Sequence, residues 1–217
     1  LLGDIFFIPN SNYYNIISNF FLSNSDAIIG ATIEKDIKTI KKNFVIYGDD
    51  IKDKAINSIR YVEEKPSLPK TNIKGNGIYV FNRSIFQAIR ETSLSTIRNE
   101  YEITDSITNL INSKKKVYYS IICDWDINIT TPEDYWKVNM KYIRGGSIID
   151  NSSRIHSQCM IVNSVIEKKV NIIFPIHIEN SIIMNNSVIR KKNPLYNSVY
   201  FYNKVIYPSR RIRMKYI

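Results

Sequence analysis

The first residue that could do chemistry is Asp4, which follows Gly3 inside the apolar segment 2–8. We expect this segment to be a buried strand, because it is short, apolar and rich in residues that favour strands. Open α/β sheets bind ligands at the carboxyl ends of their strands. Mg²⁺ prefers one or two carboxylates together with phosphate oxygens, so Asp4 is a candidate metal ligand. A turn or cap aspartate is the alternative interpretation.

A carboxylate and an ammonium are adjacent in the segment Glu63-Glu64-Lys65-Pro66. Proline restricts the backbone of the residue before it, so this turn would hold both groups in place. Such a pair can bind a sugar hydroxyl and a phosphate side by side. A solvated charged loop is the alternative.

A third group of polar residues, Asp124, Asp126 and Asn128, surrounds Trp125. We expect these residues between the end of a strand and the start of a helix, a position that suits a cation or a phosphate. Acids that complete a helix N-terminus would give the same pattern.

The histidines and cysteines form no recognisable site. Cys123 and Cys159 lack CxxC or Cys/His metal spacing, and the chain has no P-loop, GxGxxG or GxSxG motif. His156 and His177 fall in a repeat region, where surface positions are the simpler interpretation and a catalytic base for acyl transfer is the alternative.

Strands and helices alternate over the first two thirds of the chain. The expected strands are 2–8, 27–33, 44–48, 57–63, 77–82 and 116–122, and the expected helices are 11–21, 84–91, 102–111 and 131–141. Ser11 is the expected cap of the first helix, with Tyr14, Ile17 and Phe21 at helical spacing. This alternation is typical of an α/β domain with a largely parallel sheet.

After Gly145-Gly146, apolar residues recur at a period of six. The series are Ile149, Ile155 and Ile161; Ile166, Ile172, Ile178 and Met184; and Val170, Ile176, Ile182 and Val188. Asn-Ser-Val/Ile also recurs at 163, 180 and 186. A period of six predicts a parallel β-helix in which each hexapeptide forms one side of a triangular coil. Coincidence in an Ile-rich chain is the alternative.

The net charge of +10 is confined to the last third of the chain. Residues 1–140 hold 17 Lys/Arg and 17 Asp/Glu, whereas residues 141–217 hold 13 Lys/Arg and 3 Asp/Glu. The basic cluster 210–215 lacks the aromatic–basic interleaving of a single-strand binder, so we expect a solvated or partner-facing tail rather than a nucleic-acid partner. No apolar run reaches membrane-spanning length and no signal peptide opens the chain, so we expect a cytoplasmic protein with no membrane partner.

The motifs follow one another in a specific order: LGD, VEEKP, PKTNIKGNGIYVFN, RNEYEITDSITNLI, DINITTPEDYWKVN and then the repeats. In this order the chain resembles the sugar-1-phosphate nucleotidyltransferase family, especially the glucose-1-phosphate thymidylyltransferase type with a C-terminal left-handed β-helix. The resemblance implies an α/β fold, with a partial Rossmann-like nucleotidyltransferase domain at 1–144. A short left-handed parallel β-helix and a basic tail would follow at 145–217.

The resemblance also implies a reaction and its residues. Members of the family join a sugar 1-phosphate to a nucleoside triphosphate, release pyrophosphate, use Mg²⁺ and commonly form homo-oligomers. By resemblance, Asp4 is a metal ligand, and Glu64 and Lys65 contact the sugar hydroxyls and the sugar phosphate. Gly77 lies beside the sugar, and Arg98 is a phosphate-facing residue that acts with Lys65 in catalysis.

The second metal ligand departs from the family pattern Trp-x-Asp-Ile-Gly-Thr-Pro. Aligned backwards from Pro132, the aspartate position is Asn128, whereas aligned from Trp125 with one inserted residue it is Asp126. Asn is a neutral and weaker Mg²⁺ ligand, so we favour Asp126.

The family's GxGTRL loop and its downstream Pro-Lys motif, which bind the triphosphate and base, have no counterpart here. The first Met is Met140. We therefore expect an N-terminally incomplete catalytic domain that is inactive by itself. Two alternatives are a non-catalytic regulatory homologue that binds sugar phosphate and an acyltransferase built on the β-helix.

Overall fold

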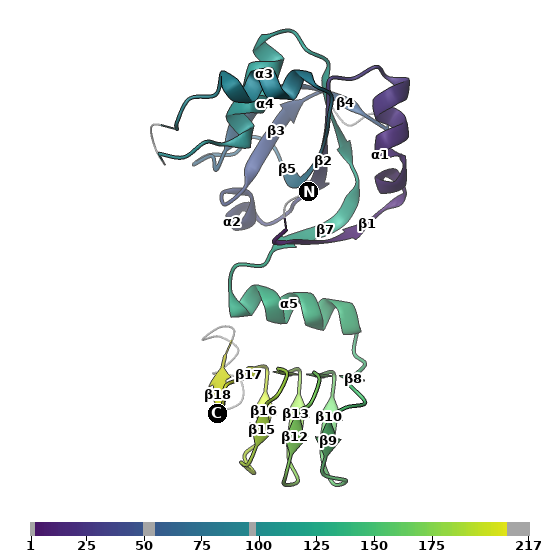
Figure 1. Cartoon of the computed structure of the whole chain (residues 1–217), viewed down its shortest axis with the longest axis vertical. Coiled ribbons are helices and arrows are strands. Elements are labelled where there is room, and N and C mark those ends of the chain that lie inside the picture. The colour runs from purple at the N-terminus through teal and green to yellow at the C-terminus, as the bar shows by residue number, and fades with distance from the viewer. Residues whose placement is uncertain (1–2, 50–54, 96–98, 208–217) are drawn as a thin grey trace. The chain divides into compact units, whose positions relative to one another are not determined.

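The computed structural model describes residues 3–49, 55–95 and 99–207 (Figure 1). The chain divides into two compact units, Leu1–Asp126 and Ile127–Ile217. Helix α5 (Pro132–Ile143) therefore belongs to the second unit, although the sequence places the domain boundary after this helix.

The first unit is built on a closed barrel with the strand order β2-β5-β3-β4-β6. Its strands are β2 (Ala27–Ile33), β3 (Phe44–Gly48), β4 (Asn57–Glu64), β5 (Ile73–Phe81) and β6 (Val117–Ile121). Only β2 and β6 pair in parallel among the described strands of the barrel, and its other pairs are antiparallel. The prediction of a largely parallel sheet was wrong. Strands β3, β4 and β5 follow one another through short connections, whereas parallel neighbours need a crossover of about a dozen residues, usually a helix.

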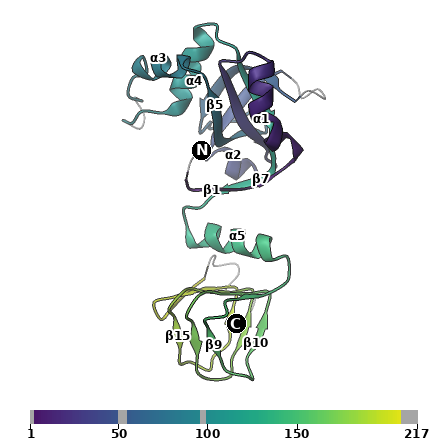
Figure 2. The same cartoon turned by 45° about the vertical axis from the view of Figure 1, so that its right-hand side comes forward.

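Helices pack on both faces of the β2 strand (Figures 1 and 2). Helices α3 (Ser84–Arg90) and α4 (Ile103–Asn112) share a buried cluster with Ile29, and α1 (Ser11–Leu22) shares another with Ile28. Adjacent residues of a strand point to opposite faces, so α1 lies on the face opposite α3 and α4.

Helix α1 buries a different stripe from the one predicted. Ile16 and Phe20 are buried, whereas Tyr14, Ile17 and Phe21 are exposed. The N-cap is Asn10 rather than Ser11. The side chains of Asn10 and Asn12 both donate to the carbonyl oxygen of Ile121, at 3.2 and 3.0 Å, which fixes the start of the helix against β6 and turns the Ile16 side inward. The amphipathic spacing alone could not show which stripe faces the sheet.

Strands β1 (Ile5–Pro9) and β7 (Cys123–Asn128) form a separate two-stranded sheet. The polar residues around Trp125 therefore lie on a strand of their own and not between the end of a strand and the start of a helix, as predicted. Their strand conformation depends on pairing with β1, which the sequence of β7 by itself could not reveal. A short helix that the sequence did not predict, α2 (Ile37–Ile40), is capped by the side chain of Asp36.

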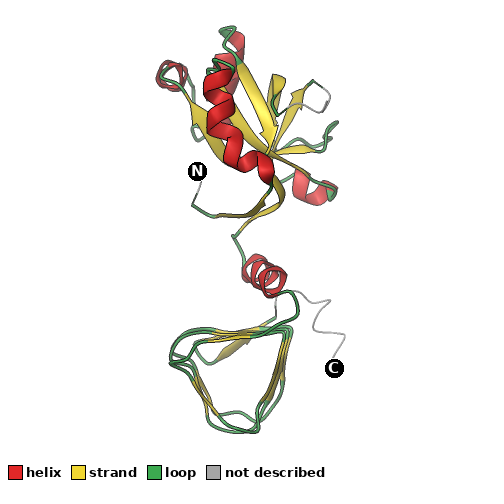
Figure 3. Cartoon of the chain, turned by 90° about the vertical axis from the view of Figure 1, so that its right-hand side faces the viewer, coloured by secondary structure: helices red, strands yellow, loops and turns green. Residues whose placement is uncertain are grey.

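The second unit is a β-helix whose coil is three-sided (Figure 3). Its short strands are β8 (Ile148–Ile149), β9 (Arg154–Ile155), β10 (Met160–Val162), β11 (Val165–Ile166), β12 (Asn171–Ile172), β13 (His177–Glu179), β14 (Ile182–Ile183), β15 (Val188–Ile189), β16 (Leu195–Tyr196), β17 (Val199–Phe201) and β18 (Lys204–Ile206). Strands β8 to β17 pair in parallel with the strands of the next coil, and β18 closes the sheet antiparallel to β17. The prediction of a β-helix is confirmed.

The repeat is 17 residues long, so the strict period of six was wrong. Parallel partners such as Val165 and Ile182, or Asn171 and Val188, are 17 positions apart. The shortened side passes through Asn163, Asn180 and Asn197, which have left-handed backbone with φ of 44°, 48° and 47°. Asn tolerates this conformation better than most residues, which suits it to this corner.

A ladder of buried serines follows these corner asparagines. The backbone N–H of Ser181 donates to Oγ of Ser164 at 3.0 Å, and the N–H of Ser198 donates to Oγ of Ser181 at 3.2 Å. All three serines are fully buried. The recurring Asn-Ser motif thus supplies both the corner conformation and the hydrogen-bond partners of the next coil.

Helix α5 packs on the β-helix through Trp136, whose Nε1 donates to the carbonyl oxygen of Asn180 at 2.7 Å. The helix starts as predicted, with Thr131 at the cap and Pro132 in the first turn, and Asp134 completes a capping box. Across the described residues, no helix is both long enough and apolar enough to cross a membrane.

Candidate active site

Asp4 lies at the start of the two-stranded sheet and not at the carboxyl end of a barrel strand. The strand begins after it, at Ile5, and the Asp4 side chain is exposed in a turn. Phe6 of β1 packs edge-on against Trp125 of β7, with 6.3 Å between ring centroids. The exposed carboxylate is accessible to a cation or a donor from solvent.

Glu64 and Lys65 mark the end of β4. Lys65 has left-handed backbone with φ of 46°, and its N–H donates to the carbonyl oxygen of Asn43 at 3.1 Å. Its ammonium lies 3.8 Å from Oε1 of Glu64, and the two side chains are 42% and 24% exposed. The strand end therefore presents a carboxylate and an ammonium together at the surface.

The two glutamates of this segment face opposite sides of the sheet. Glu63 accepts a hydrogen bond from the Tyr47 hydroxyl at 3.0 Å. Glu64 pairs in register with Phe44, whose ring stacks with that of Tyr79. Burial raises the pKa of Tyr79, and the nearby charge of Glu64 raises it further. Tyr79 therefore stays a neutral hydroxyl group.

Gly77 lies in an irregular part of β5. Strand pairing runs from Tyr79 with Ile29 to Gly75 with Ala31, so three residues of β5 oppose Gly30 alone. Gly77 has φ of 73°, in the left-handed region that glycine adopts without steric cost. This bulge breaks the ladder near Tyr79.

A buried ion pair that the sequence did not predict joins β5 to β7. The Lys74 ammonium lies 2.7 Å from Oδ2 of Asp126 and 3.9 Å from Oε2 of Glu34. The side chains of Lys74 and Asp126 are each 1% exposed. Lys74 pairs in register with Val45, and Val45 pairs with Glu63, so this ion pair lies on the Glu63 face, opposite Glu64. The structure therefore does not bring Asp126 and Glu64 together.

Asp126 does not fit the role of a metal ligand. One carboxylate oxygen is held by the Lys74 ammonium, and a divalent ion at the other would lie beside that ammonium in a buried site, where like charges repel strongly. Within the described residues, no group of three or more His, Cys, Asp or Glu could hold a metal. Asp4 fits better, because it is exposed and Mg²⁺ can complete its ligands with phosphate oxygens and water.

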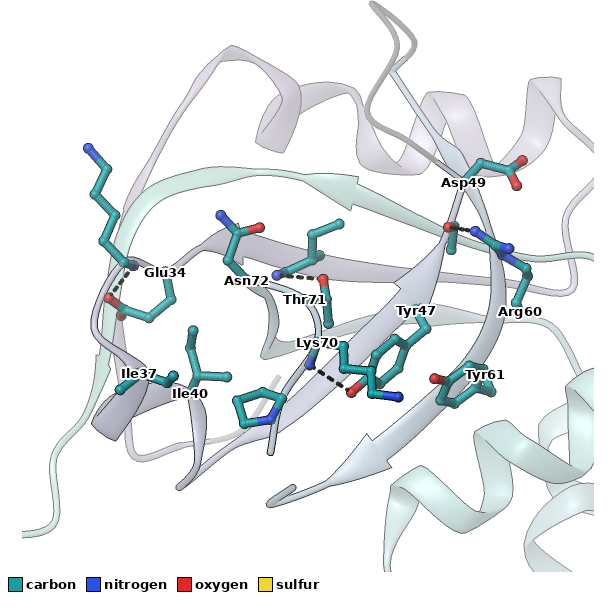
Figure 4. A pocket seen from close by; sticks show the side chains of 14 residues that line it. Glu34, Ile37, Ile40, Tyr47, Asp49, Arg60, Tyr61, Lys70, Thr71 and Asn72 are labelled. Carbon is teal, nitrogen blue, oxygen red and sulfur yellow. Dashed lines mark hydrogen bonds between the residues drawn. The ribbon is translucent and has the colours of Figure 1, made fainter. Parts of the chain in front are cut away.

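A pocket of about 1020 Å³ opens on the Glu63 face of the first unit (Figure 4). The rings of Tyr47 and Tyr61 stack in its wall with centroids 4.2 Å apart, and the Lys70 N–H donates to the Tyr47 hydroxyl at 3.3 Å. Glu34 and Arg60 also line it. The pocket contains none of the residues predicted for the site, although its aromatic and cationic groups suit a polar anion.

The remaining candidates are Arg98, the basic cluster 210–215, the cysteines and the histidines. Arg98 and the basic cluster 210–215 lie outside the described residues. Burial raises the pKa of the Cys123 thiol, so this group is a poor nucleophile at neutral pH. His177 Nδ1 is 3.1 Å from the Tyr196 hydroxyl on a side of the β-helix.

A comparison with known families decides which family the chain belongs to. The Nucleotidyl transferase family matches residues 1–145, which is most of the chain. The chain belongs to this family. The family that the order of motifs predicted is therefore confirmed.

Relatives of this nucleotidyl transferase chain include the bifunctional protein GlmU of Methanocaldococcus jannaschii, which is 32% identical over 136 residues, or 63% of this chain and 31% of the relative. The glucose-1-phosphate adenylyltransferase of Clostridium acetobutylicum is 28% identical over 134 residues, or 61% of this chain and 34% of the relative. The chain thus spans about a third of the length of these curated relatives. The crystal structure of UDP-glucose pyrophosphorylase complexed with UDP-glucose is similar in fold, with a TM-score of 0.57 and 20% identity over 66% of this chain and 55% of that one.

Sequence reasoning missed Lys74 and the pocket residues Tyr47, Arg60 and Tyr61. Lys74 stands at an inward position of a strand that is mostly apolar or glycine, IKGNGIYVF, where a charge demands a buried partner. That rule was the available signal. No sequence rule identified Asp126 as that partner.

Proposed function

We propose that this chain serves the transfer of a nucleotidyl group from a nucleoside triphosphate to a sugar 1-phosphate, giving an NDP-sugar and pyrophosphate. The observation that carries the proposal is the Glu64–Lys65 pair at the end of β4, in a chain that belongs to the nucleotidyl transferase family. A carboxylate accepts hydrogen bonds from sugar hydroxyls, and an ammonium pairs with a phosphate.

In this mechanism, an oxygen of the sugar phosphate attacks the α-phosphorus of the triphosphate, and the bond from that phosphorus to the leaving pyrophosphate breaks. Lys65 neutralises charge on the sugar phosphate, and Glu64 fixes the sugar through its hydroxyl groups. The left-handed backbone at Lys65 and the bulge at Gly77 orient these contacts. Arg98 belongs to the proposal as a second phosphate-facing cation. Such positioning supplies most of the catalysis in phosphoryl transfer.

Other parts of the proposal follow from the family. Mg²⁺, when bound against phosphates at Asp4, would neutralise their charge. We name no base, because the relatives include an adenylyltransferase and the UTP–glucose-1-phosphate uridylyltransferase AglF of Haloferax volcanii. The homo-oligomer that the resemblance implies and the cytoplasmic location expected from the sequence are part of the same proposal.

A second function, binding of a sugar phosphate without turnover, is favoured by the Lys74–Asp126 pair. That pair neutralises the carboxylate that one of the two alignments to the family pattern assigns to a metal. Both functions share the Glu64–Lys65 contacts and differ in whether product forms.

Calorimetric titration of the chain with glucose 1-phosphate tests the shared part. We expect saturable binding that is stronger than for glucose or inorganic phosphate alone, because both groups of the ligand are held. Binding no stronger than that of phosphate would contradict the proposal. Release of pyrophosphate with a panel of nucleoside triphosphates would then favour transfer, and its absence would favour binding without turnover.

A further inference from the structure

We infer that Lys74 is a resident cation that occupies the position between Asp126 and Glu34, so that Asp126 is a structural partner of Lys74 and not a metal ligand in this chain. The inference does not depend on sugar-phosphate binding, because it concerns the Glu63 face of the sheet, whereas Glu64 lies on the opposite face.

The Lys74 ammonium is bound between two carboxylates. Lys74 Nζ is 2.7 Å from Oδ2 of Asp126, the distance of a charge-assisted hydrogen bond, and 3.9 Å from Oε2 of Glu34. The Lys74 side chain is 1% exposed, so the ammonium has exchanged its water shell for these carboxylates. The Lys74 ammonium therefore occupies the place between two carboxylates that a metal ion bound by Asp126 would have to occupy.

Glu34 is fixed in a way that directs it toward Lys74. Its Oε1 accepts hydrogen bonds from the backbone N–H groups of Lys35 and Asp36, at 2.8 and 2.9 Å. These bonds hold the carboxylate at the end of β2, and its other oxygen faces the ammonium. The position of Glu34 is therefore set by the backbone and does not require a bound ion.

The other polar neighbours on this side of β5 bind one another. Thr32, which pairs in register with Lys74, has its hydroxyl 2.8 Å from Sγ of Cys123, and the Asn76 amide donates to the same sulfur at 3.2 Å. The Oδ1 atom of Asp126 is buried and has no hydrogen-bond partner in the described structure. Among the described residues, the cation paired with Asp126 is Lys74, through Oδ2.

The test uses Mn²⁺ as the probe and NMR as the readout, in an Asp4→Asn background that removes the exposed carboxylate of β1. In this background, we expect Mn²⁺ to leave the amide signals of Asp126 and Lys74 sharp. Adding Lys74→Ala should create a saturable site that broadens these signals and raises the melting temperature with Mn²⁺ concentration. Lys74→Gln keeps a donor for Asp126 and serves as the second variant, so the test does not depend on the folding of Lys74→Ala.

Saturable broadening at Asp126 with Lys74 intact would overturn the inference, since it would make Asp126 a metal ligand. Equally, no Mn²⁺ site in either Lys74 variant would show that the ammonium is not what excludes the ion. Lys70→Ala, which removes an exposed lysine of the same unit, is the matched control and should gain no site. No sugar phosphate enters the titration, so its outcome is independent of the proposed function.

Discussion

The ammonium of Lys74 lies 2.7 Å from Oδ2 of Asp126, and both side chains are almost completely buried. Removing one partner would leave the other charge uncompensated in the interior. We expect Lys74→Ala and Asp126→Ala each to lower the free energy of unfolding by about 3–5 kcal/mol. Urea denaturation followed by the fluorescence of Trp125, on the same strand as Asp126, measures this loss.

Two controls make this prediction specific. The double variant Lys74→Met/Asp126→Leu should recover most of the stability, because an apolar pair of similar volume replaces a buried ion pair at little cost. Lys137→Ala removes an exposed partner of Glu133, 2.9 Å away, and should cost about 0.5 kcal/mol or less in the second unit. Equal losses for the buried and the exposed pair would contradict the burial argument.

The left-handed backbone at Gly77 gives a second prediction. A Cβ at φ of 73° is strained, so Gly77→Ala should destabilise the first unit by about 1–2 kcal/mol. Gly3→Ala is the control, because an added Cβ there would meet no atom within 4 Å. Thermal unfolding of both variants measures the difference, and a Gly77→Ala chain as stable as wild type would show that the bulge relaxes.

The start of α5 should make the second unit sensitive to acid. Burial acts to raise the pKa of Asp134, but hydrogen bonds from Thr131 and Thr130 outweigh it and hold that pKa below its ordinary value of 3.8. The unfolded chain therefore binds more protons in acid, and this stabilisation is present above pH 3.8 and is lost as the pH falls through the lowered pKa.

The measurement is the acid unfolding of a Trp125→Phe chain, which leaves Trp136 of α5 as the fluorescent reporter. We expect Asp134→Ala to flatten the loss of stability below about pH 4 and to cost about 1 kcal/mol at neutral pH, as the loss of a helix cap does. An unchanged acid slope in Asp134→Ala would refute the assignment.

The serine ladder gives a prediction for the β-helix. Ser181→Ala removes the Oγ that accepts from the Ser198 N–H, and an unpaired buried N–H costs about 1–3 kcal/mol. Ser152→Ala removes a similar acceptor, for the Lys169 N–H at 2.9 Å, but at an exposed corner where water can replace it. Thermal unfolding should separate the two variants, and losses of equal size would argue against the ladder.

Local patterns predicted most of the elements but not their neighbours. The apolar segment 27–33 and the Thr131-Pro132 start of α5 carry strand and capping signals that act within a few residues, and both were correct. The mixed barrel and the β1–β7 pair depend on contacts between distant segments, which local spacing does not encode. The coil length of 17 residues was missed because one of the three sides of the coil, at the Asn180 corner, is one residue shorter than the period of six.

The candidate site also contains residues that the sequence could predict and residues that it could not. Glu64 and Lys65 could be predicted together because they are adjacent and stand at a strand end before a proline. The burial of Asp126 against Lys74 could not be predicted, because the two residues are 52 positions apart and their pairing depends on strand register. The sequence showed that both charges exist, whereas only the fold shows that they neutralise each other.

The most direct test of the account is the affinity for glucose 1-phosphate of wild type, Lys65→Ala and Lys70→Ala, measured by calorimetric titration. Losing a charge-assisted contact of about 1.5–3 kcal/mol predicts that Lys65→Ala binds at least about tenfold more weakly. Lys70 lines the pocket on the Glu63 face, and Lys70→Ala should bind as wild type does. Unchanged affinity in Lys65→Ala together with a loss in Lys70→Ala would contradict the account and move the sugar-phosphate site to that pocket.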